Sequence, residues 1–187
     1  MNLRERKQQR ARDAIVAAAY ELFAERGFAQ VTVTDIAARA EVGRTTFFRY
    51  FGDKQEVLFA DEQSLLDALA EAPADAPAPP DLRAALTQLW DLTASLGGVL
   101  VGDPARYAEH ERLIAANPEL QDRVNRKLQR IADSLEALLR ARGAAPETAV
   151  LASQIAIACF RAAQRTAGDD PAALLPAMRN TVDLLLA

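Results

Sequence analysis

Two short helix-forming segments within residues 32–51, separated by a turn, constrain the fold of this chain more than any other feature. Thr32 followed three positions later by Asp35 is a pairing that caps the start of a helix. The second segment, 44–51, begins after Gly43 and is rich in aromatic, cationic and hydroxyl side chains. Two short helices joined by about three residues, with a longer helix before them, have the dimensions of a helix-turn-helix.

The mixed composition of the second segment is explained if its helix has an inner and an outer face. So small a module needs aromatic rings to fill its core, and we expect Phe47 and Phe51 to pack inward. The opposite face then presents Arg44, Thr45 and Thr46 to a major groove, where Arg reads guanine edges and Thr offers a hydroxyl and a methyl group. The segment therefore predicts a DNA-reading helix.

Charge is unevenly distributed along the chain. The net charge of the 187 residues is −4, but residues 1–54 hold 10 Lys and Arg against 7 Asp and Glu, which gives +3. The remainder holds 12 against 19, which gives −7. A basic front end on an acidic body indicates that only the front meets a polyanion. Charge alone leaves open that a basic helix start is merely solvated.

The rest of the chain continues in helical periodicity. Apolar residues recur three and four positions apart, and the abundant Ala, Leu, Glu, Arg and Gln favour helices. Residues 71–80 are rich in proline and predict a linker or an ordered surface loop. With no strand-like alternation of useful length, the predicted fold class is all-α. The expected helices are 10–26, 54–70 with Asp53 as its cap, 82–96, 107–116, 120–142, 146–166 and 171–186.

Several classes of protein and site are disfavoured by the residues available. The single cysteine excludes an internal disulfide, and the single histidine argues against a histidine-based metal site, so we expect a reducing, cytoplasmic compartment and no cofactor. The chain shows no signal-type apolar run and no 18 uninterrupted apolar residues, which predicts that it does not engage a membrane. An enzyme is disfavoured because no nucleophile and base of recognisable spacing, phosphate loop or metal cluster is found.

The stretch "GFAQVTVTDIAARAEVGRTTFFRYFGDKQEVL", from Gly27 to Leu58, resembles the DNA-binding signature of the tetracycline-repressor (TetR) family. The likeness runs through about thirty residues, and the helices before and after fit the family's layout over the whole chain. This resemblance implies an N-terminal three-helix helix-turn-helix domain, residues 1–53, followed by a helical bundle, residues 54–187, for ligand binding and dimerisation. It also implies a homodimeric regulator, usually a repressor, that leaves a palindromic double-stranded DNA operator when a small molecule binds.

The same resemblance implies a set of DNA contacts on and around the second short helix. Thr34 would approach a phosphate, and Lys54 would meet the backbone through its ammonium and neighbouring amide groups. Thr32 is either a helix cap or a phosphate ligand. The remaining contacts implied are Arg44, Thr45, Thr46, Phe48, Arg49 and Tyr50.

Three positions depart from the family pattern. Glu41 stands where the turn usually has Gly, so a non-glycine residue has to tolerate a positive φ. Gly43 replaces the usual Ser and loses a side-chain cap. Phe48 replaces the usual Tyr and loses its hydroxyl, while Tyr50 replaces His and offers one nearby. These departures bear on operator sequence and affinity rather than on the module itself.

In the C-terminal region, a few large or polar-tipped side chains interrupt otherwise aliphatic helices. Pockets in helical bundles are typically apolar with a few such groups, so Trp90, Tyr107, His110 and Phe160 are candidates for contact with a small apolar or amphipathic ligand. Each of them is equally compatible with an ordinary place in the core or on the surface.

The last two expected helices carry an excess of apolar residues, which indicates a partner surface. A helix pair that meets its symmetry mate forms a four-helix interface, and two recognition helices one turn of duplex apart read a palindrome. The interface candidates are Val150, Ile155, Leu174, Met178, Val182 and Leu185. A dimer that binds DNA without any ligand, as an architectural protein or a constitutive repressor or activator, remains the alternative.

Overall fold

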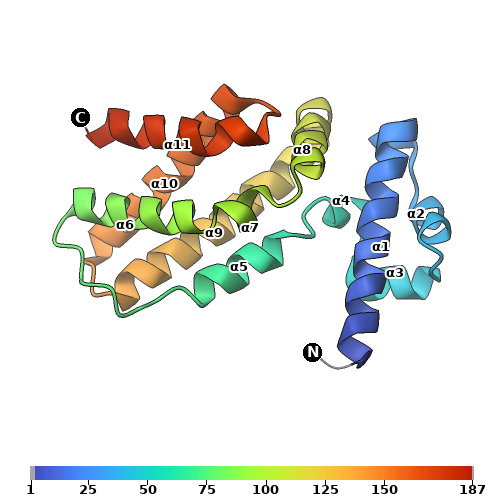
Figure 1. Ribbon diagram of the computed structural model, residues 1–187, viewed down its shortest axis with the longest axis horizontal. Helices are drawn as coiled ribbons and strands as arrows, with labels where there is room; N and C mark the ends of the chain where they lie inside the picture. Colours follow the sequence, from blue (N-terminus) through green and yellow to red (C-terminus); the bar gives the residue numbers. More distant parts are fainter. Residues whose placement is uncertain (1–2, 187) are drawn as a thin grey trace. The chain divides into compact units, whose positions relative to one another are not determined.

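The computed structural model describes residues 3–186, with side chains described throughout except at 3–5, 99–100 and 186. All the elements within that range are helical, which confirms the all-α prediction (Figure 1). They are α1 (Leu3–Arg26), η1 (Phe28–Gln30), α2 (Val33–Arg39), α3 (Arg44–Tyr50), α4 (Lys54–Val57), α5 (Glu62–Ala70), α6 (Leu82–Ser95), α7 (Gly97–Val101), α8 (Pro104–Ala116), η2 (Pro118–Leu120), α9 (Gln121–Ala141), α10 (Pro146–Ala167) and α11 (Pro171–Leu186).

The chain divides into two compact units. The first, here called the N-terminal unit, comprises the residues up to Asp61 together with Ala115–Asn117, and the second, the C-terminal unit, comprises Glu62–Ile114 and the residues from Pro118 onward. The sequence-based boundary after residue 53 lies just before α4, whose four residues group with the N-terminal unit.

The N-terminal unit is built on α1, against which α2, α3 and α4 pack. Its centre consists of side chains that are almost completely buried, each contributing about 1.5–3 kcal/mol by removal from water. They are Ile15, Leu22 and Phe23 of α1, Ile36 of α2 and Phe47 of α3. Because α2 and α3 have seven residues each, neither could be stable alone, and the long helix supplies the surface on which both are held.

The expected single helix over residues 54–70 is interrupted, which corrects that prediction. Residues 58–61 form a tighter turn between α4 and α5, with Leu58, Phe59 and Ala60 each donating its amide to the carbonyl three positions earlier. The four residues 57–60 are all buried, and an α-helix cannot turn four consecutive side chains to one side. Arg12 of α1 also donates to the carbonyl oxygen of Ala60, which removes that acceptor from the helical ladder.

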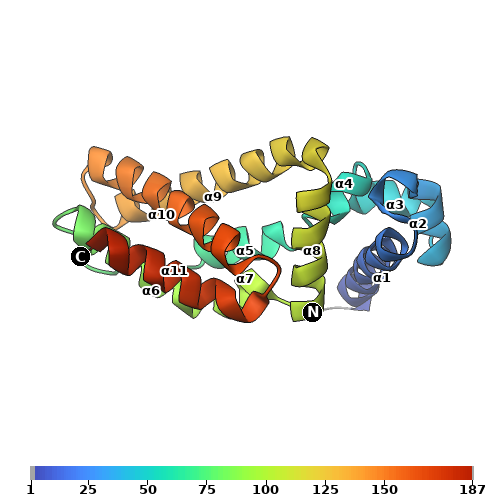
Figure 2. The ribbon, with the colours of Figure 1, turned by 90° about the horizontal axis from the view of Figure 1, so that it is seen from above.

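In the C-terminal unit, α10 is the central helix and packs against α6, α9 and α11 (Figures 1 and 2). Two apolar clusters result, one centred on Leu89, Leu135 and Leu139 and the other on Tyr107, Leu174 and Met178. Helix α8 crosses one end of this bundle in Figure 2. No helix among the described residues has the length and apolar character needed to cross a membrane.

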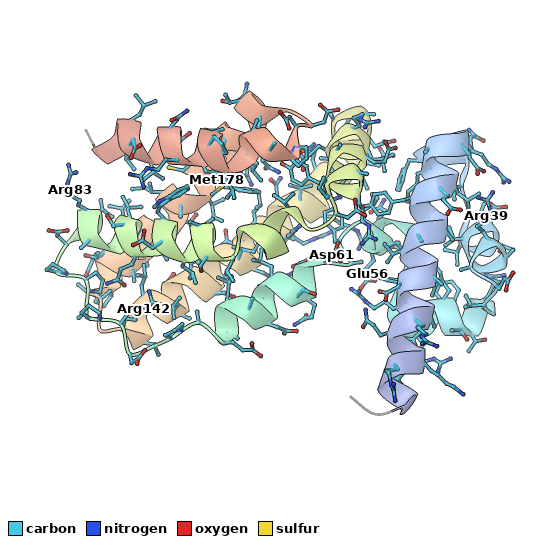
Figure 3. The ribbon with its side chains drawn as sticks, in the orientation of Figure 1. Arg39, Glu56, Asp61, Arg83, Arg142 and Met178 are labelled. Atoms are coloured by element: carbon cyan, nitrogen blue, oxygen red, sulfur yellow. The ribbon has the colours of Figure 1, made fainter. Side chains whose placement is uncertain are left out.

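The proline-rich segment 71–80 is an ordered loop rather than a free linker. Arg142, buried at the end of α9, donates from Nε and Nη2 to the carbonyl oxygen of Pro73 at 3.0 and 2.8 Å (Figure 3). Gln88 of α6 donates to the carbonyl oxygen of Pro77 at 2.8 Å and accepts from Arg142 at 3.2 Å. Prolines contribute no amide donors, so the loop's carbonyls are instead satisfied by side chains of the bundle.

Candidate functional site

The first of the two short helices, α2, starts with a complete capping box, as the sequence predicted. The Thr32 hydroxyl accepts from the Asp35 amide at 3.2 Å, and the Asp35 carboxylate accepts from the Thr32 amide at 2.9 Å. The hydroxyl also donates to that carboxylate at 2.5 Å, and these bonds lower the pKa of Asp35. Thr32 is therefore engaged as a cap, while Thr34 in the first turn is exposed.

The turn after α2 is closed by a residue with positive φ. The amide of Glu41 bonds to the carbonyl of Ala38 and that of Val42 to the carbonyl of Ala37, a pairing known as a Schellman motif. Glu41 has φ 54°, which confirms the expectation from its place where Gly is usual. An L-residue in this region costs about 1–2 kcal/mol, so the turn is held at some expense in strain.

Helix α3 separates an inner from an outer face, as expected. Phe47 is completely buried and Phe51, directly after the helix, is 3% exposed. Arg44, Thr45 and Arg49 are exposed on the outside, and Thr46 is partly exposed. As predicted, Gly43 at the N-cap provides no side-chain hydrogen bond.

The outer face of α3 is partly ordered by contacts among its own side chains. The Arg44 guanidinium lies 5.9 Å from the centre of the Phe48 ring, and Phe48 is 48% exposed. Arg49 donates to the Thr46 hydroxyl at 3.1 Å and lies 5.7 Å from the Tyr50 ring centre. Both guanidinium groups are therefore supported by an aromatic ring, an arrangement that limits their rotamers before any partner binds.

Lys54 is placed differently from the sequence-based expectation. Its ammonium group donates to the carbonyl oxygens of Phe28 at 2.7 Å, Ala29 at 3.3 Å and Val31 at 2.9 Å, and lies 4.5 Å from the Phe28 ring centre. An ammonium has three donors, and three carbonyls take them. The ammonium therefore closes the turn after α1, which corrects that part of the prediction for Lys54; contact of the neighbouring amide groups with the DNA backbone stays a prediction.

A charged network that the sequence reading missed fixes α2 to α1. Arg39 forms ion pairs with Glu25 at 2.8 Å and Glu21 at 3.2 Å, and its place beside α1 is visible in Figure 3. The hydrogen bond from Arg39 lowers the pKa of Glu25, and both carboxylates raise the pKa of Arg39. Because Glu21 and Glu25 are one helical turn apart, their spacing was the available signal for this pairing.

Three of the four ligand candidates lie in one apolar cluster of the C-terminal unit. Tyr107 is in the centre of that cluster, and Trp90 and Phe160 pack against it from partly buried positions. Trp90 also has the Arg179 guanidinium 5.5 Å from its ring centre. His110 lies on α8 with Tyr107 and is partly buried.

The hydroxyl of Tyr107 stands out because it is buried and has no hydrogen-bond partner in the protein. The side chain is 8% exposed, and burial together with the negative charge of Glu111 raises its pKa above the ordinary range, while the neighbouring Gln164 side chain acts in the opposite direction. Glu111 accepts a hydrogen bond from Gln164 of α10 at 3.1 Å, and burial raises the pKa of this carboxyl, while Lys127 lowers it. Glu111 and Gln164 were missed from the sequence, although Tyr107 and Glu111 share the helical spacing that puts both on one face.

The interface candidates fall into two groups. Leu174 is completely buried and Met178 is 6% exposed, both inside the C-terminal unit's own core; Met178 lies on the side of α11 that faces α6 (Figure 3). This corrects the prediction for these two, since a side chain buried in its own core offers no contact to a partner. Val150 and Leu185 are 41% and 49% exposed, and Ile155 and Val182 are partly buried.

Two exposed leucines on the same helices were missed. Leu151 is 49% exposed and Leu184 is 81% exposed. Because α10 and α11 form a hairpin, the start of α10 and the end of α11 lie at the same end of that pair. Apolar side chains from both helices therefore gather at one end of the hairpin.

Chemically, these arrangements favour binding over catalysis. The outer face of α3 offers guanidinium and hydroxyl groups of the kind that contact phosphates and base edges. Within the described part of the chain, no three His, Cys, Asp or Glu side chains gather in a way that could hold a metal ion.

Comparison with known proteins gives the same picture for the first part of the chain. Residues 15–60 match the family model of bacterial regulatory proteins, tetR family. Over 145 residues, 75% of this chain, the sequence is 32% identical to the HTH-type transcriptional regulator TcmR of Streptomyces glaucescens. Over 67 residues, 33% of this chain, it is 45% identical to the HTH-type transcriptional repressor Rv3405c of Mycobacterium tuberculosis. The matches span 63% and 36% of these two relatives, less than two thirds of either.

Solved structures share the fold over most of the chain. The repressor SmeT of the Stenotrophomonas maltophilia multidrug efflux pump SmeDEF superimposes with a TM-score of 0.63 at 22% identity, covering 94% of this chain and 88% of that one. The repressor FadR of Thermus thermophilus, in complex with lauroyl-CoA, gives a TM-score of 0.58 at 21% identity and covers 94% and 93%. At such identities the likeness concerns the fold alone.

Proposed function

We propose that this chain is a homodimeric transcriptional regulator of the TetR type, which its residues 15–60 match, and that it reads a palindromic DNA operator with α3. The observation that carries this proposal is the division of α3 into a buried aromatic face and an exposed face with Arg44, Thr45 and Arg49. A helix so held by its inner face can enter a major groove without rearranging.

The proposed DNA contacts divide by chemistry. Arg44, at the first position of α3, reads a guanine edge, and Thr45 and Thr46 contact bases or phosphates beside it. Thr34, Arg49 and Tyr50 contact the backbone and set the register of the helix. Phe48 contributes an apolar contact, and Lys54 acts indirectly by holding the turn after α1.

Dimerisation is proposed through the exposed apolar end of the α10–α11 hairpin. Val150, Leu151, Leu184 and Leu185 are each at least 41% exposed there, and meeting a second copy would bury them in a four-helix interface. Replacing both Leu151 and Leu184 by Glu is expected to yield a monomer in sedimentation, whereas Arg83→Glu, on the exposed side of α6, is expected to leave the dimer intact.

Response to a small apolar or amphipathic effector is proposed for the C-terminal unit. Two proteins with this fold have solved structures with small molecules bound, SmeT with triclosan and FadR with lauroyl-CoA. An effector releases DNA only if it binds better to a conformation in which the two recognition helices are wrongly spaced. Residues 54–70 connect the two units, and the turn at 58–61 is the segment whose change we propose to couple them.

The experiment that tests this proposal is selection of duplexes from random DNA by the purified protein, followed by anisotropy titrations of the enriched sequence. Enrichment of a palindrome whose two halves lie about one helical turn apart would support a dimeric regulator. Failure to enrich any sequence would contradict it. An enriched palindrome that no small molecule releases would favour the ligand-independent dimer instead.

A further inference from the structure

The Tyr107 hydroxyl is an unusual feature of a packed helical bundle. A buried hydroxyl without a hydrogen bond costs about 1–3 kcal/mol, and buried polar groups are therefore almost always paired. Tyr107 is more than nine-tenths buried, and its hydroxyl makes no hydrogen bond of good geometry in the protein, although the Gln164 side chain is close enough to act on it. A group kept in this state is positioned for a partner from outside the chain.

The surroundings of this hydroxyl form a small polar region inside an apolar wall. Glu111, one turn further along α8, is close enough for its charge to act on Tyr107, and Gln164 of α10 donates to Glu111 at 3.1 Å. Trp90 and Phe160 pack against the same cluster and are partly exposed, so its apolar wall reaches the surface. Polar groups at one end of an apolar, aromatic-lined region match an amphiphile.

The charges that face this region decide what kind of polar end can bind. An anionic end would be placed beside the Glu111 carboxylate, which burial already disfavours in its charged form. A cationic end would be attracted by the Glu111 carboxylate, but it would also meet the field of Lys127 of α9, which acts on Glu111, and Arg179 of α11 already lies against the Trp90 ring. An uncharged end avoids both repulsions and the cost of burying a charge.

We infer that Tyr107, Glu111 and Gln164 bind the polar end of an uncharged amphiphile that donates a hydrogen bond, such as a long-chain alcohol. The ligand hydroxyl accepts from the Tyr107 hydroxyl and donates to the Glu111 carboxylate, while its apolar chain lies against Phe160 and Trp90. This inference rests on the proposed effector response and specifies the chemical class of the effector.

Trp90 is the single tryptophan of the chain and packs against this cluster, so its fluorescence reports occupancy directly. The test is a titration of the full-length protein with octan-1-ol, octanoate and octylammonium, which share one chain and do not absorb where Trp90 is excited. Octanol is expected to change Trp90 fluorescence saturably, with octanoate and octylammonium each at least about tenfold weaker.

Two variants connect the binding to the named residues. Tyr107→Phe removes only the hydroxyl and is expected to weaken octanol about fivefold, while Tyr20→Phe makes the same change in the N-terminal unit as a control. Glu111→Gln keeps an acceptor beside Gln164 but removes the charge, and is expected to raise octanoate affinity about tenfold. If the role of Glu111 were purely structural, Glu111→Gln would not change the affinity for octanoate relative to that for octanol.

Several outcomes would overturn the inference. Absence of saturable octanol binding would do so, as would tightest binding of octanoate or octylammonium, or equal octanol affinity of the wild type and Tyr107→Phe. The same protein preparations are also tested for binding to the selected duplex. Sequence-selective DNA binding without octanol binding would refute only this inference. Absence of both octanol binding and sequence-selective DNA binding would also refute the proposed regulator.

Discussion

The two units of this protein differ in how the polar side chains at their candidate sites are paired. In the N-terminal unit, Arg12, Arg39 and Lys54 each bond to carbonyls or carboxylates of the same unit. In the C-terminal unit, the buried Tyr107 hydroxyl makes no hydrogen bond of good geometry, and Glu111 accepts a hydrogen bond from the neutral amide of Gln164. The first arrangement fixes a helix in one position for a rigid partner, and the second leaves polar capacity for a molecule from outside.

The largest effect is expected from removing a core side chain of α3. Phe47→Ala is expected to destabilise the N-terminal unit by about 3–5 kcal/mol, because a completely buried ring is replaced by a cavity. Phe48→Ala removes a ring that is 48% exposed and is expected to cost less than about 1 kcal/mol. Urea unfolding followed by circular dichroism measures both.

Trp90 fluorescence separates the units in that experiment, because Trp90 belongs to the C-terminal unit. In Phe47→Ala, part of the unfolding followed by circular dichroism should shift to lower urea concentration, while the unfolding followed by Trp90 fluorescence should keep its wild-type midpoint. Equal losses for Phe47→Ala and Phe48→Ala would contradict the two-faced helix.

Lys54→Met sharpens the distinction between a structural cation and a DNA-binding one. Loss of the bonds to three carbonyls is expected to cost the N-terminal unit about 2 kcal/mol. Under conditions where the variant is folded, the dependence of DNA affinity on salt is expected to remain that of the wild type. A phosphate contact would reduce the slope of log affinity against log salt by about 0.9, and such a reduction would show that Lys54 binds DNA directly.

Tyr107→Phe is expected to stabilise the C-terminal unit, in contrast to most core substitutions. Removing an unpaired buried hydroxyl without changing the ring is expected to raise the free energy of unfolding by about 1 kcal/mol. Urea unfolding monitored by Trp90 fluorescence, without added ligand, measures the change. A loss of stability would mean that the hydroxyl is bonded to an ordered water, and the contrast between the units would be weaker.

Glu41→Gly tests the strain in the turn between α2 and α3. Glycine accepts the φ of 54° without penalty, and the N-terminal unit is expected to gain about 0.5–1 kcal/mol. Gly43→Ala is the matched control, because a Cβ at that position meets nothing within 4 Å and the φ is ordinary. A loss of stability in Glu41→Gly would indicate that the glutamate side chain contributes more than the turn geometry.

Acidification should affect the two units in opposite directions. The pKa values of Glu25 and Asp35 are lowered by hydrogen bonds, so their stabilisation is present at neutral pH and is lost as pH falls through the folded-state values, which lie below those of the unfolded chain. The pKa of Glu111 is raised by burial, so its charged form opposes folding at neutral pH and protonation relieves that effect. In thermal unfolding between pH 7 and pH 3, the melting temperature of the N-terminal unit should therefore fall first. Parallel shifts in the melting temperatures of the two units would contradict this.

The fold and much of the recognition module could be predicted from sequence because they depend on local chemistry. The Thr32–Asp35 capping box, the Asp53 cap and the positive φ of Glu41 each involve residues within a few positions of one another. The inner placement of Phe47 follows from helical periodicity. Such features are the same wherever the segment is embedded, and the structure confirms them.

What could not be predicted depends on residues far apart in the chain. The break between α4 and α5 involves Arg12, which is 48 positions from the carbonyl it binds. The ammonium of Lys54 reaches carbonyls at least 23 positions away, and Gln164 meets Glu111 across 53 positions. Leu174 was assigned to an interface because periodicity distinguishes an apolar face from a polar one but does not say whether its own chain or a partner covers it.

The central claim is that α3 reads DNA with its exposed face. The most direct measurement is fluorescence anisotropy of the selected duplex and a scrambled duplex at several salt concentrations, with wild-type protein, Arg44→Ala and, as a control in the C-terminal unit, Arg83→Ala. We expect selective binding that weakens with salt, loss of most of that selectivity in Arg44→Ala, and none in Arg83→Ala. Equal binding to both duplexes by the wild type, or undiminished selectivity in Arg44→Ala, would contradict the account.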